Sequence, residues 1–206
     1  MVAVVLPAGA RHLPGYLDRA QQMTLLRAIE RIFEQAQPYR PTMPRTGKPL
    51  SVMMTNAGPF GWVTDKDGGY RYQAAHPVTG APWPPIPDML MRIWDEVADY
   101  PAPPEACLVN IYRAGTKMGS HVDADEADKL APVVSVSLGD DAVFHIGGTR
   151  RSDAKIRLTL KSGDVVVLGG ESRMAYHGID RLLPGTSDLV PGGGRINLTL
   201  RRVTKP

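Results

Sequence analysis

Three short stretches of the chain alternate between polar and apolar residues: 108–112, 134–137 and 195–201. Successive side chains of a β-strand point to opposite faces, so each stretch predicts a strand with one polar and one apolar face. Together they favour a small barrel or jelly roll that holds a polar ligand inside and packs its outer face on another layer. An edge strand with its polar face in water gives the same pattern, so each stretch alone leaves that alternative open.

Two segments repeat apolar residues at helical spacing. The first runs from Asp18 to Gln37 and stops at Pro38, and the second opens at Pro87-Asp88. We expect the first helix to contact the core. The stripes are Met23, Leu26, Ile29, Ile32 and Phe33 in the first helix and Leu90, Ile93, Trp94 and Val97 in the second.

Further strands and two hairpins are predicted from turn residues. A strand is expected over 51–56, and Asp67-Gly68 marks a hairpin between 61–64 and 70–72. From residue 106 onward short strands dominate. The plainest pattern there predicts a hairpin that pairs 157–160 with 165–168 around the turn at 161–164.

Composition fits a single enzyme domain. The chain has 206 residues, 43% of them hydrophobic, and a net charge of +3, which permits nucleic-acid binding without requiring it. The single cysteine, Cys107, excludes an internal disulfide and a multi-cysteine zinc site, and its apolar surroundings predict a buried, inert thiol. With no long apolar run and no signal peptide, we expect a cytoplasmic protein that does not associate with membranes.

His121-Val122-Asp123 and a lone His177 are the candidate metal ligands. In an extended segment His121 and Asp123 project to the same side, and 54 residues separate Asp123 from His177, enough for the third ligand to come from another strand. Two histidines and one carboxylate form the facial triad of non-haem Fe(II), which leaves positions open for a cosubstrate and O2. An H-x-D pair by itself is common in polar loops, so the metal-site interpretation depends on the other residues found with it.

Arg195, in the last alternating stretch, is a candidate clamp for a dicarboxylate beside that iron. The remaining histidines lack a partner at metal spacing and are interpreted as non-ligands. The glycine pairs and triplets are interpreted as turns, because no Lys-Ser/Thr follows them as in a phosphate loop. These histidines are His12, His76 and His145.

A family resemblance extends from about residue 50 to 202. The chain resembles the AlkB family of Fe(II)- and 2-oxoglutarate-dependent nucleic-acid demethylases. The pieces that carry it are Met54-Thr-Asn56, Gly61-Trp62, Gly69-Tyr70 with Tyr72, Cys107-Leu-Val-Asn110-Ile-Tyr112, His121-Val-Asp123-Ala-Asp125-Glu126, Pro132-Val-Val-Ser-Val-Ser-Leu-Gly139, Gly163-Asp164-Val-Val-Val, Gly169-Gly-Glu-Ser-Arg173, Tyr176-His177-Gly178-Ile179 and Arg195-x-Asn197-Leu-Thr-Leu-Arg201.

The resemblance implies a mainly β (α+β) fold. A double-stranded β-helix, or jelly roll, would occupy residues 103–206. Residues 1–102 would supply two supporting helices and a nucleotide-recognition hairpin lid, all within one compact unit. It also implies that His121, Asp123 and His177 ligate the iron.

For the cosubstrate, the resemblance implies that Arg195 pairs with the distal carboxylate of 2-oxoglutarate, helped by Tyr112 and Asn197. Asn110 and Arg201 would lie toward the keto-acid end. Six residues of a straight strand span about 20 Å, so Arg201 reaches the same ligand only if strand twist and long side chains converge. Its alternative role is a buried partner for Asp123 or another carboxylate. The family pattern would place bulkier side chains at Leu168 and Ala175, which predicts a roomier cosubstrate pocket.

For the substrate, the resemblance implies that Trp62 and Tyr70 line the pocket of a flipped base, although a core role is the alternative for Trp62. Asp125 would offer a carboxylate to a cationic methylated base, and otherwise it is an ordinary loop acid. Tyr72 and Arg157 are expected to contact phosphate or base, with exposed surface positions as the alternative.

The implied activity is oxidative demethylation of N-alkylated bases such as 1-methyladenine or 3-methylcytosine. It would act as a monomer on single- or double-stranded DNA, with RNA also open, consuming O2 and 2-oxoglutarate and releasing formaldehyde, succinate and CO2. The alternatives are the same chemistry on tRNA, mRNA, protein or lipid, and a cupin-like metal-binding module without turnover. A zinc hydrolase is disfavoured because it has no use for Arg195.

Overall fold

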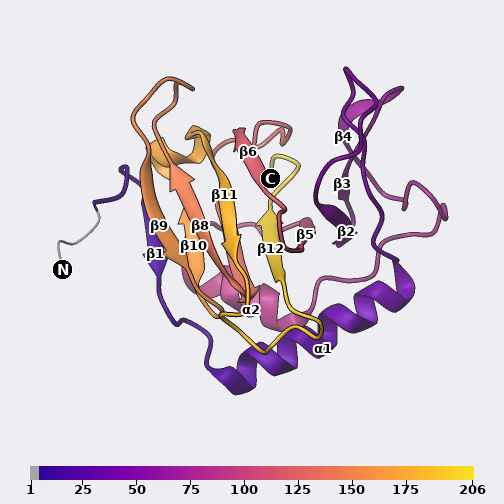
Figure 1. Ribbon diagram of the computed structural model, residues 1–206. Coiled ribbons are helices and arrows are strands. Elements are labelled where there is room, and N and C mark those ends of the chain that lie inside the picture. The colour runs from indigo at the N-terminus through magenta and orange to yellow at the C-terminus, as the bar shows by residue number, and fades with distance from the viewer. Residues whose placement is uncertain (1–4) are drawn as a thin grey trace.

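The computed structural model describes residues 5–206, whose strands form two facing sheets and a separate hairpin (Figure 1). The larger sheet has six strands in the order β1-β10-β7-β12-β5-β2, the smaller has four in the order β6-β11-β8-β9, and β3 pairs with β4. This is the mainly β jelly roll that the sequence predicts. The strands are β1 (Ala10–Leu13), β2 (Met53–Ala57), β3 (Gly61–Asp65), β4 (Gly69–Gln73), β5 (Ala106–Tyr112), β6 (Met118–His121), β7 (Val133–Gly139), β8 (Asp141–Ile146), β9 (Ile156–Leu160), β10 (Val165–Leu168), β11 (His177–Leu183) and β12 (Arg195–Arg201).

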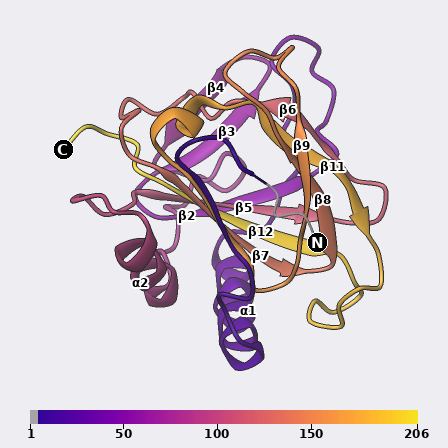
Figure 2. The ribbon, with the colours of Figure 1, turned by 90° about the vertical axis from the view of Figure 1, so that its left-hand side faces the viewer.

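Two α-helices, α1 (Arg19–Gln35) and α2 (Asp88–Val97), cover the outer face of the larger sheet (Figure 2). The apolar residues of the alternating strands, such as Val136 and Leu198, pack in one core with the helices. Their polar partners therefore face the smaller sheet. The predicted outer layer is confirmed, and the jelly roll keeps its polar side chains inside.

Helix α1 begins with a capping box, in which Asp18 accepts from the backbone of Gln21 and the Gln21 side chain accepts from the backbone of Asp18. Such a cap contributes about 1 kcal/mol. The predicted buried stripe is wrong at Met23, which is 41% exposed. Gln22 is buried in its place because its amide donates to the carbonyl of Leu17.

The predicted hairpin of 157–160 with 165–168 is wrong in its pairing. Both segments are strands, but β9 pairs with β8 in the smaller sheet, whereas β10 pairs with β7 and β1 in the larger sheet. Gly163 adopts a φ of +89° and donates its N–H to the Ser137 carbonyl. The turn at 161–164 therefore crosses from one sheet to the other.

The first 102 residues contribute to the sheets as well as to the helices. β1 and β2 are the edge strands of the larger sheet, where they lie beside β10 and β5. Cys107 lies on β5, fully buried against the helix layer. Among residues 5–206, neither helix has the length and apolar character that crossing a lipid bilayer requires.

Candidate active site

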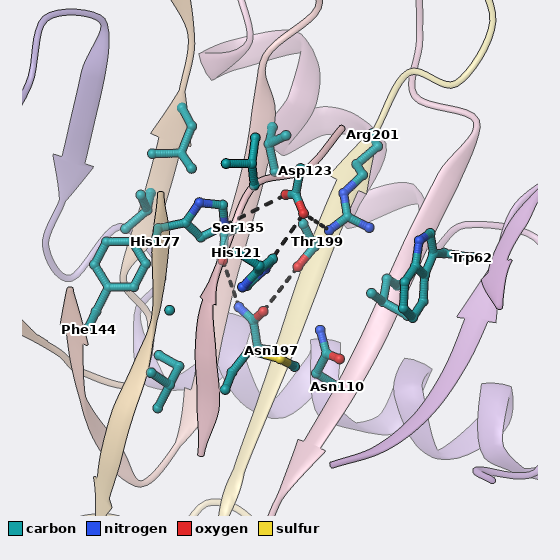
Figure 3. A pocket seen from close by; sticks show the side chains of 18 of the residues that line it. Trp62, Asn110, His121, Asp123, Ser135, Phe144, His177, Asn197, Thr199 and Arg201 are labelled. Atoms are coloured by element: carbon teal, nitrogen blue, oxygen red, sulfur yellow. Dashed lines mark hydrogen bonds and ion pairs between the residues drawn. The ribbon is translucent and has the colours of Figure 1, made fainter. Parts of the chain in front are cut away.

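A cavity of about 480 Å³ lies between the two sheets, lined by the inner faces of both and by the β3–β4 hairpin. Figure 3 shows Phe144 of β8 on one side and Trp62 of β3 on the other, with the predicted metal ligands between them. The polar face of β12 forms part of the wall, through Arg195, Asn197, Thr199 and Arg201.

His121, Asp123 and His177 meet in this cavity, with ligand atoms all within 4.8 Å of one another. His121 ends β6 and pairs in register with His177 at the start of β11, while Asp123 follows β6. Gly178 permits this register, because a Cβ there would lie 2.6 Å from the Met118 carbonyl oxygen. The sequence-predicted triad is therefore assembled from two neighbouring strands and the loop after one of them.

The donor atoms of the triad suit a divalent ion. Nε2 of His121 lies 3.7 Å from Oδ1 of Asp123, and Nε2 of His177 lies 3.8 Å from Oδ2. One ion with ligand bonds of about 2.1 Å spans such separations. Oδ2 of Asp123 is buried without a hydrogen-bond partner within residues 5–206. A buried oxygen beside two imidazoles that lacks a hydrogen-bond partner fits the role of a metal ligand.

Backbone carbonyls fix the tautomers of both histidines. Nδ1 of His121 lies 2.9 Å from the Gly119 carbonyl oxygen, and Nδ1 of His177 lies 3.0 Å from that of Ala175. Because a carbonyl oxygen only accepts, Nδ1 carries the proton and Nε2 presents its lone pair to the cavity. Burial lowers the pKa of His177 to about 4, which keeps that ligand neutral.

Asp123 is held ionised by Arg201. Burial alone raises the pKa of this carboxyl group. The Arg201 guanidinium and the two histidines lower the pKa by more than burial raises it, which leaves it well below its usual range. Nη2 of Arg201 donates to Oδ1 of Asp123 at 2.8 Å (Figure 3). The alternative role predicted for Arg201, a buried partner of Asp123, is therefore present, and Arg201 also lines the cavity.

Arg195 presents an unpaired cation to the other end of the cavity. Its side chain is 1% exposed and donates from Nη2 to Ser137 Oγ, whereas Nε and Nη1 lack partners in the described part of the chain. Burial lowers its pKa, and the guanidinium lies 5.8 Å from the centre of the Tyr112 ring. A buried cation with two donor nitrogens that no residue of 5–206 satisfies needs an anion, so the pocket fits the distal carboxylate of 2-oxoglutarate.

The two predicted asparagines also line the cavity, on paired strands. Asn197 donates to Ser135 Oγ at 2.7 Å and accepts from Thr199 at 3.0 Å. Oδ1 of Asn110 is buried and has no partner among the residues described. Asn110 therefore has unused hydrogen-bonding capacity facing a ligand.

The aromatic pair of the hairpin stands at the mouth of the cavity. The Trp62 and Tyr70 rings stack with centroids 5.6 Å apart and planes inclined by 21°. The Trp62 indole N–H donates to Asp125 Oδ2 at 2.7 Å. Asn56 bonds the Trp62 backbone through both its amide nitrogen and its oxygen. Trp62, Tyr70 and Asp125 are thus brought together, and Trp62 is only partly buried.

Two predicted substrate contacts lie outside the cavity lining. The Tyr72 hydroxyl donates to Glu126 at 2.5 Å, behind the triad. Arg157, on β9, pairs with Asp180 at 2.8 Å near an opening between β1 and β9. Of the two positions expected to enlarge the pocket, Leu168 lines the cavity and Ala175 is buried. His12, His76 and His145 contact Asp164, the Gln37 carbonyl oxygen and Asp180, respectively.

Sequence reasoning missed three groups at this site. Arg151 stacks its guanidinium 5.0 Å from the Tyr176 ring centre at the cavity rim, and nothing in the local pattern separates it from other surface arginines. Glu126 and Arg173 form a buried ion pair at 2.9 Å. Both lie within stretches that carry the family resemblance, and a charged residue within such a stretch is itself a signal.

Comparison with known proteins places this geometry in a family. The model of the 2OG-Fe(II) oxygenase superfamily matches residues 9–201. An alpha-ketoglutarate-dependent dioxygenase AlkB homolog of Caulobacter vibrioides is 53% identical over 92% of this chain and 85% of its own. The alpha-ketoglutarate-dependent dioxygenase AlkB of Escherichia coli is 43% identical over 97% and 93%.

A solved structure agrees with this assignment. That of OsALKBH1 superposes with a TM-score of 0.81 and 30% identity, covering 96% of this chain and all of the other. The chain therefore belongs to the 2OG-Fe(II) oxygenase superfamily and, within it, to the AlkB family of alpha-ketoglutarate-dependent dioxygenases.

Proposed function

We propose that this protein removes alkyl groups oxidatively from N-alkylated bases of the 1-methyladenine and 3-methylcytosine type in DNA. One observation carries the proposal. A single cavity joins a two-histidine, one-carboxylate triad, a buried arginine with free N–H groups and a stacked aromatic pair at its mouth. The first two features bind iron and 2-oxoglutarate, and the third accepts a planar base.

With Fe(II), 2-oxoglutarate and O2 bound, the site supplies the oxidation that converts an N-methyl group to a hydroxymethyl group, which leaves as formaldehyde. His121, Asp123 and His177 hold the metal through Nε2 and carboxylate oxygens. Arg195 orients 2-oxoglutarate by its distal carboxylate, and Asn110 and Asn197 offer further hydrogen bonds. The apolar wall, with Phe144 and Ile179, keeps water away from the reacting carbon.

Recognition of the base rests on the hairpin. A base reaches the cavity only after it is flipped out of its stack. Trp62 and Tyr70 offer aromatic surfaces to it, and stacking contributes about 1–3 kcal/mol per base. The Asp125 carboxylate, held by the Trp62 indole, supplies a negative charge near that position. A base that carries a positive charge through alkylation is favoured over its neutral parent.

The test is a coupled assay. The protein is reconstituted with Fe(II) without oxygen, then incubated in air with 2-oxoglutarate and a single-stranded DNA oligonucleotide bearing one 1-methyladenine. Mass spectrometry follows oligonucleotide and succinate. Loss of one methyl group with matching succinate and formaldehyde supports the proposal. Succinate without demethylation would indicate an RNA or protein substrate instead of DNA. Demethylation of the same sequence as an RNA oligonucleotide then distinguishes RNA from protein. If folded, iron-loaded protein yields neither demethylated oligonucleotide nor succinate, the proposal is contradicted.

Trp62→Ala is expected to lower kcat/KM for the methylated oligonucleotide by about 5- to 150-fold, because a stacking surface of about 1–3 kcal/mol is lost. Trp62→Phe keeps an aromatic face but loses the N–H bond to Asp125, so a smaller loss is expected. Steady-state kinetics measure both. Co(II) affinity and thermal unfolding serve as controls and should not change. A Trp62→Ala protein that fails to fold would favour the core role for this residue.

A further inference from the structure

Four buried charges form a group that includes the triad carboxylate and extends behind it. They belong to Asp123, Glu126, Arg173 and Arg201, whose side chains are each at most 7% exposed. Two acids face two arginines, so the group is balanced without the metal. In a buried setting such charges are strongly coupled, because little water screens them.

Glu126 occupies the centre of this group. Its Oε2 accepts from Arg173 at 2.9 Å, and its Oε1 lies 3.4 Å from Nε of Arg201. Arg173 also donates to the backbone carbonyls of Asp123 at 2.6 Å and Ala131 at 2.8 Å. Arg173 thus fixes both ends of the loop that carries the ligand and Glu126.

The β3–β4 hairpin is joined to this group by one hydroxyl. Tyr72 of β4 stands opposite Trp62 in the hairpin register and donates to Oε1 of Glu126 at 2.5 Å. The same oxygen faces Arg201, whose Nη2 bonds the metal ligand Asp123 at 2.8 Å. A continuous chain of polar contacts therefore runs from the base-facing hairpin to an oxygen of the triad (Figure 3 shows its last link).

We propose that Tyr72 and Glu126 are positioning residues that couple the hairpin to the metal ligand Asp123 through Arg201. A base that shifts the hairpin alters the Tyr72–Glu126 contact. The contact of Arg201 with Glu126 then changes relative to its contact with Asp123. A different contact with Arg201 changes the negative charge that Asp123 offers to the metal. This inference rests on the proposed function, since a base must occupy the hairpin.

The test measures thermodynamic coupling between two ligands. Co(II) is titrated without oxygen, with 2-oxoglutarate saturating, and its binding is followed by ligand-field absorption. The titration is repeated with the oligonucleotide that carries 1-methyladenine. Coupling of two sites is reciprocal and typically changes affinity about 5- to 150-fold. We expect at least a fivefold change in wild type and less than a twofold change in Tyr72→Phe.

The coupling factor separates a relay from a simple contact. If Tyr72 touched only the nucleic acid, Tyr72→Phe would weaken oligonucleotide binding equally with and without Co(II), and the factor would not move. Tyr100→Phe is the matched control, because the Tyr100 hydroxyl donates to Asp128 at 2.6 Å in the same loop. That variant removes a similar bond that does not reach Arg201, and it should keep the wild-type factor.

The outcomes are distinct. Coupling lost in Tyr72→Phe and kept in Tyr100→Phe supports the relay. No coupling in wild type, or equal coupling in wild type and Tyr72→Phe, overturns the relay while demethylation still supports the proposed function. Absence of both oligonucleotide binding and demethylation in wild type overturns both. Glu126→Gln, which keeps the shape of the side chain and removes its charge, should likewise reduce the factor.

Discussion

Alanine at His121 or at Asp123 is expected to abolish turnover, and the two variants are expected to differ in stability. Each change removes one of three ligands. Changes outside the ligand set already weaken metal binding by about 10- to 100-fold, so loss of a ligand should weaken Co(II) binding by at least about 100-fold. Turnover should then fall to the background of the assay.

The stability difference follows from burial. The His121 side chain is 39% exposed, so His121→Ala should change the unfolding free energy of the metal-free protein by less than about 1 kcal/mol. Asp123→Ala leaves the Arg201 guanidinium buried without its nearest carboxylate, and breaking such a pair costs about 3–5 kcal/mol. Urea unfolding of metal-free protein measures the difference.

His12→Ala is a suitable control for both variants. His12 lies on β1, the edge strand of the larger sheet, where it pairs with Asp164, and it does not line the triad cavity. It should retain full turnover. Full turnover in His121→Ala or Asp123→Ala would refute the assignment of that residue as a ligand.

Arg195→Met is expected to raise the KM for 2-oxoglutarate by at least about 30-fold. Removing one member of a buried charge pair costs about 2–5 kcal/mol of binding, and each 1.4 kcal/mol is about a factor of ten. Arg195→Lys should retain part of the affinity, because an ammonium group keeps the charge but not the two parallel donors. Succinate production at varied 2-oxoglutarate concentrations measures both variants.

The same substitution is expected to leave the ligand-free protein equally stable or more stable. Two N–H groups of Arg195 have no partner within residues 5–206, and a buried unpaired donor is unfavourable. Arg195→Met removes the unfavourable free energy of these unpaired donors. Added 2-oxoglutarate should no longer raise the melting temperature of this variant. An unchanged KM would refute the clamp role.

Arg202→Met supplies the opposite case for comparison. Arg202 is mostly buried one residue past β12, but its guanidinium already bonds Thr204 and lies 3.4 Å from Glu105. Its removal should lower stability and leave the KM for 2-oxoglutarate unchanged. The pair of variants separates an arginine that awaits a ligand from one that serves the fold.

The parts of the fold that depend on local pattern were predicted from the sequence. The helix at Asp18 follows from its apolar spacing and its stop at Pro38, and the strand at 195–201 from its alternation. The pairing of 157–160 with 165–168 was wrong because alternation and a turn specify two strands, not their neighbours. Which sheet each strand joins is decided by distant contacts, such as that of Gly163 with Ser137.

The site divides in the same way. Residue type and spacing made His121, Asp123, His177 and Arg195 candidates, and the family resemblance supplied the role expected of each. The role of Arg201 stayed open because strand spacing alone does not say whether a long side chain bends to a ligand or to a carboxylate. Tyr72 was expected at the substrate, but its hydroxyl contacts Glu126, which a sequence presents as one more acid in a polar loop.

Cys107 gives the protein an internal reporter of its own opening. Burial raises the pKa of this thiol to about 12, so at neutral pH the closed protein carries almost none of the reactive thiolate. β5 lies between β12 and β2 and beneath the helix layer, so a reagent reaches the sulfur only when that layer separates from the sheet. The rate of thiol labelling therefore measures the free energy of this opening, one probe to a molecule, without any engineered label.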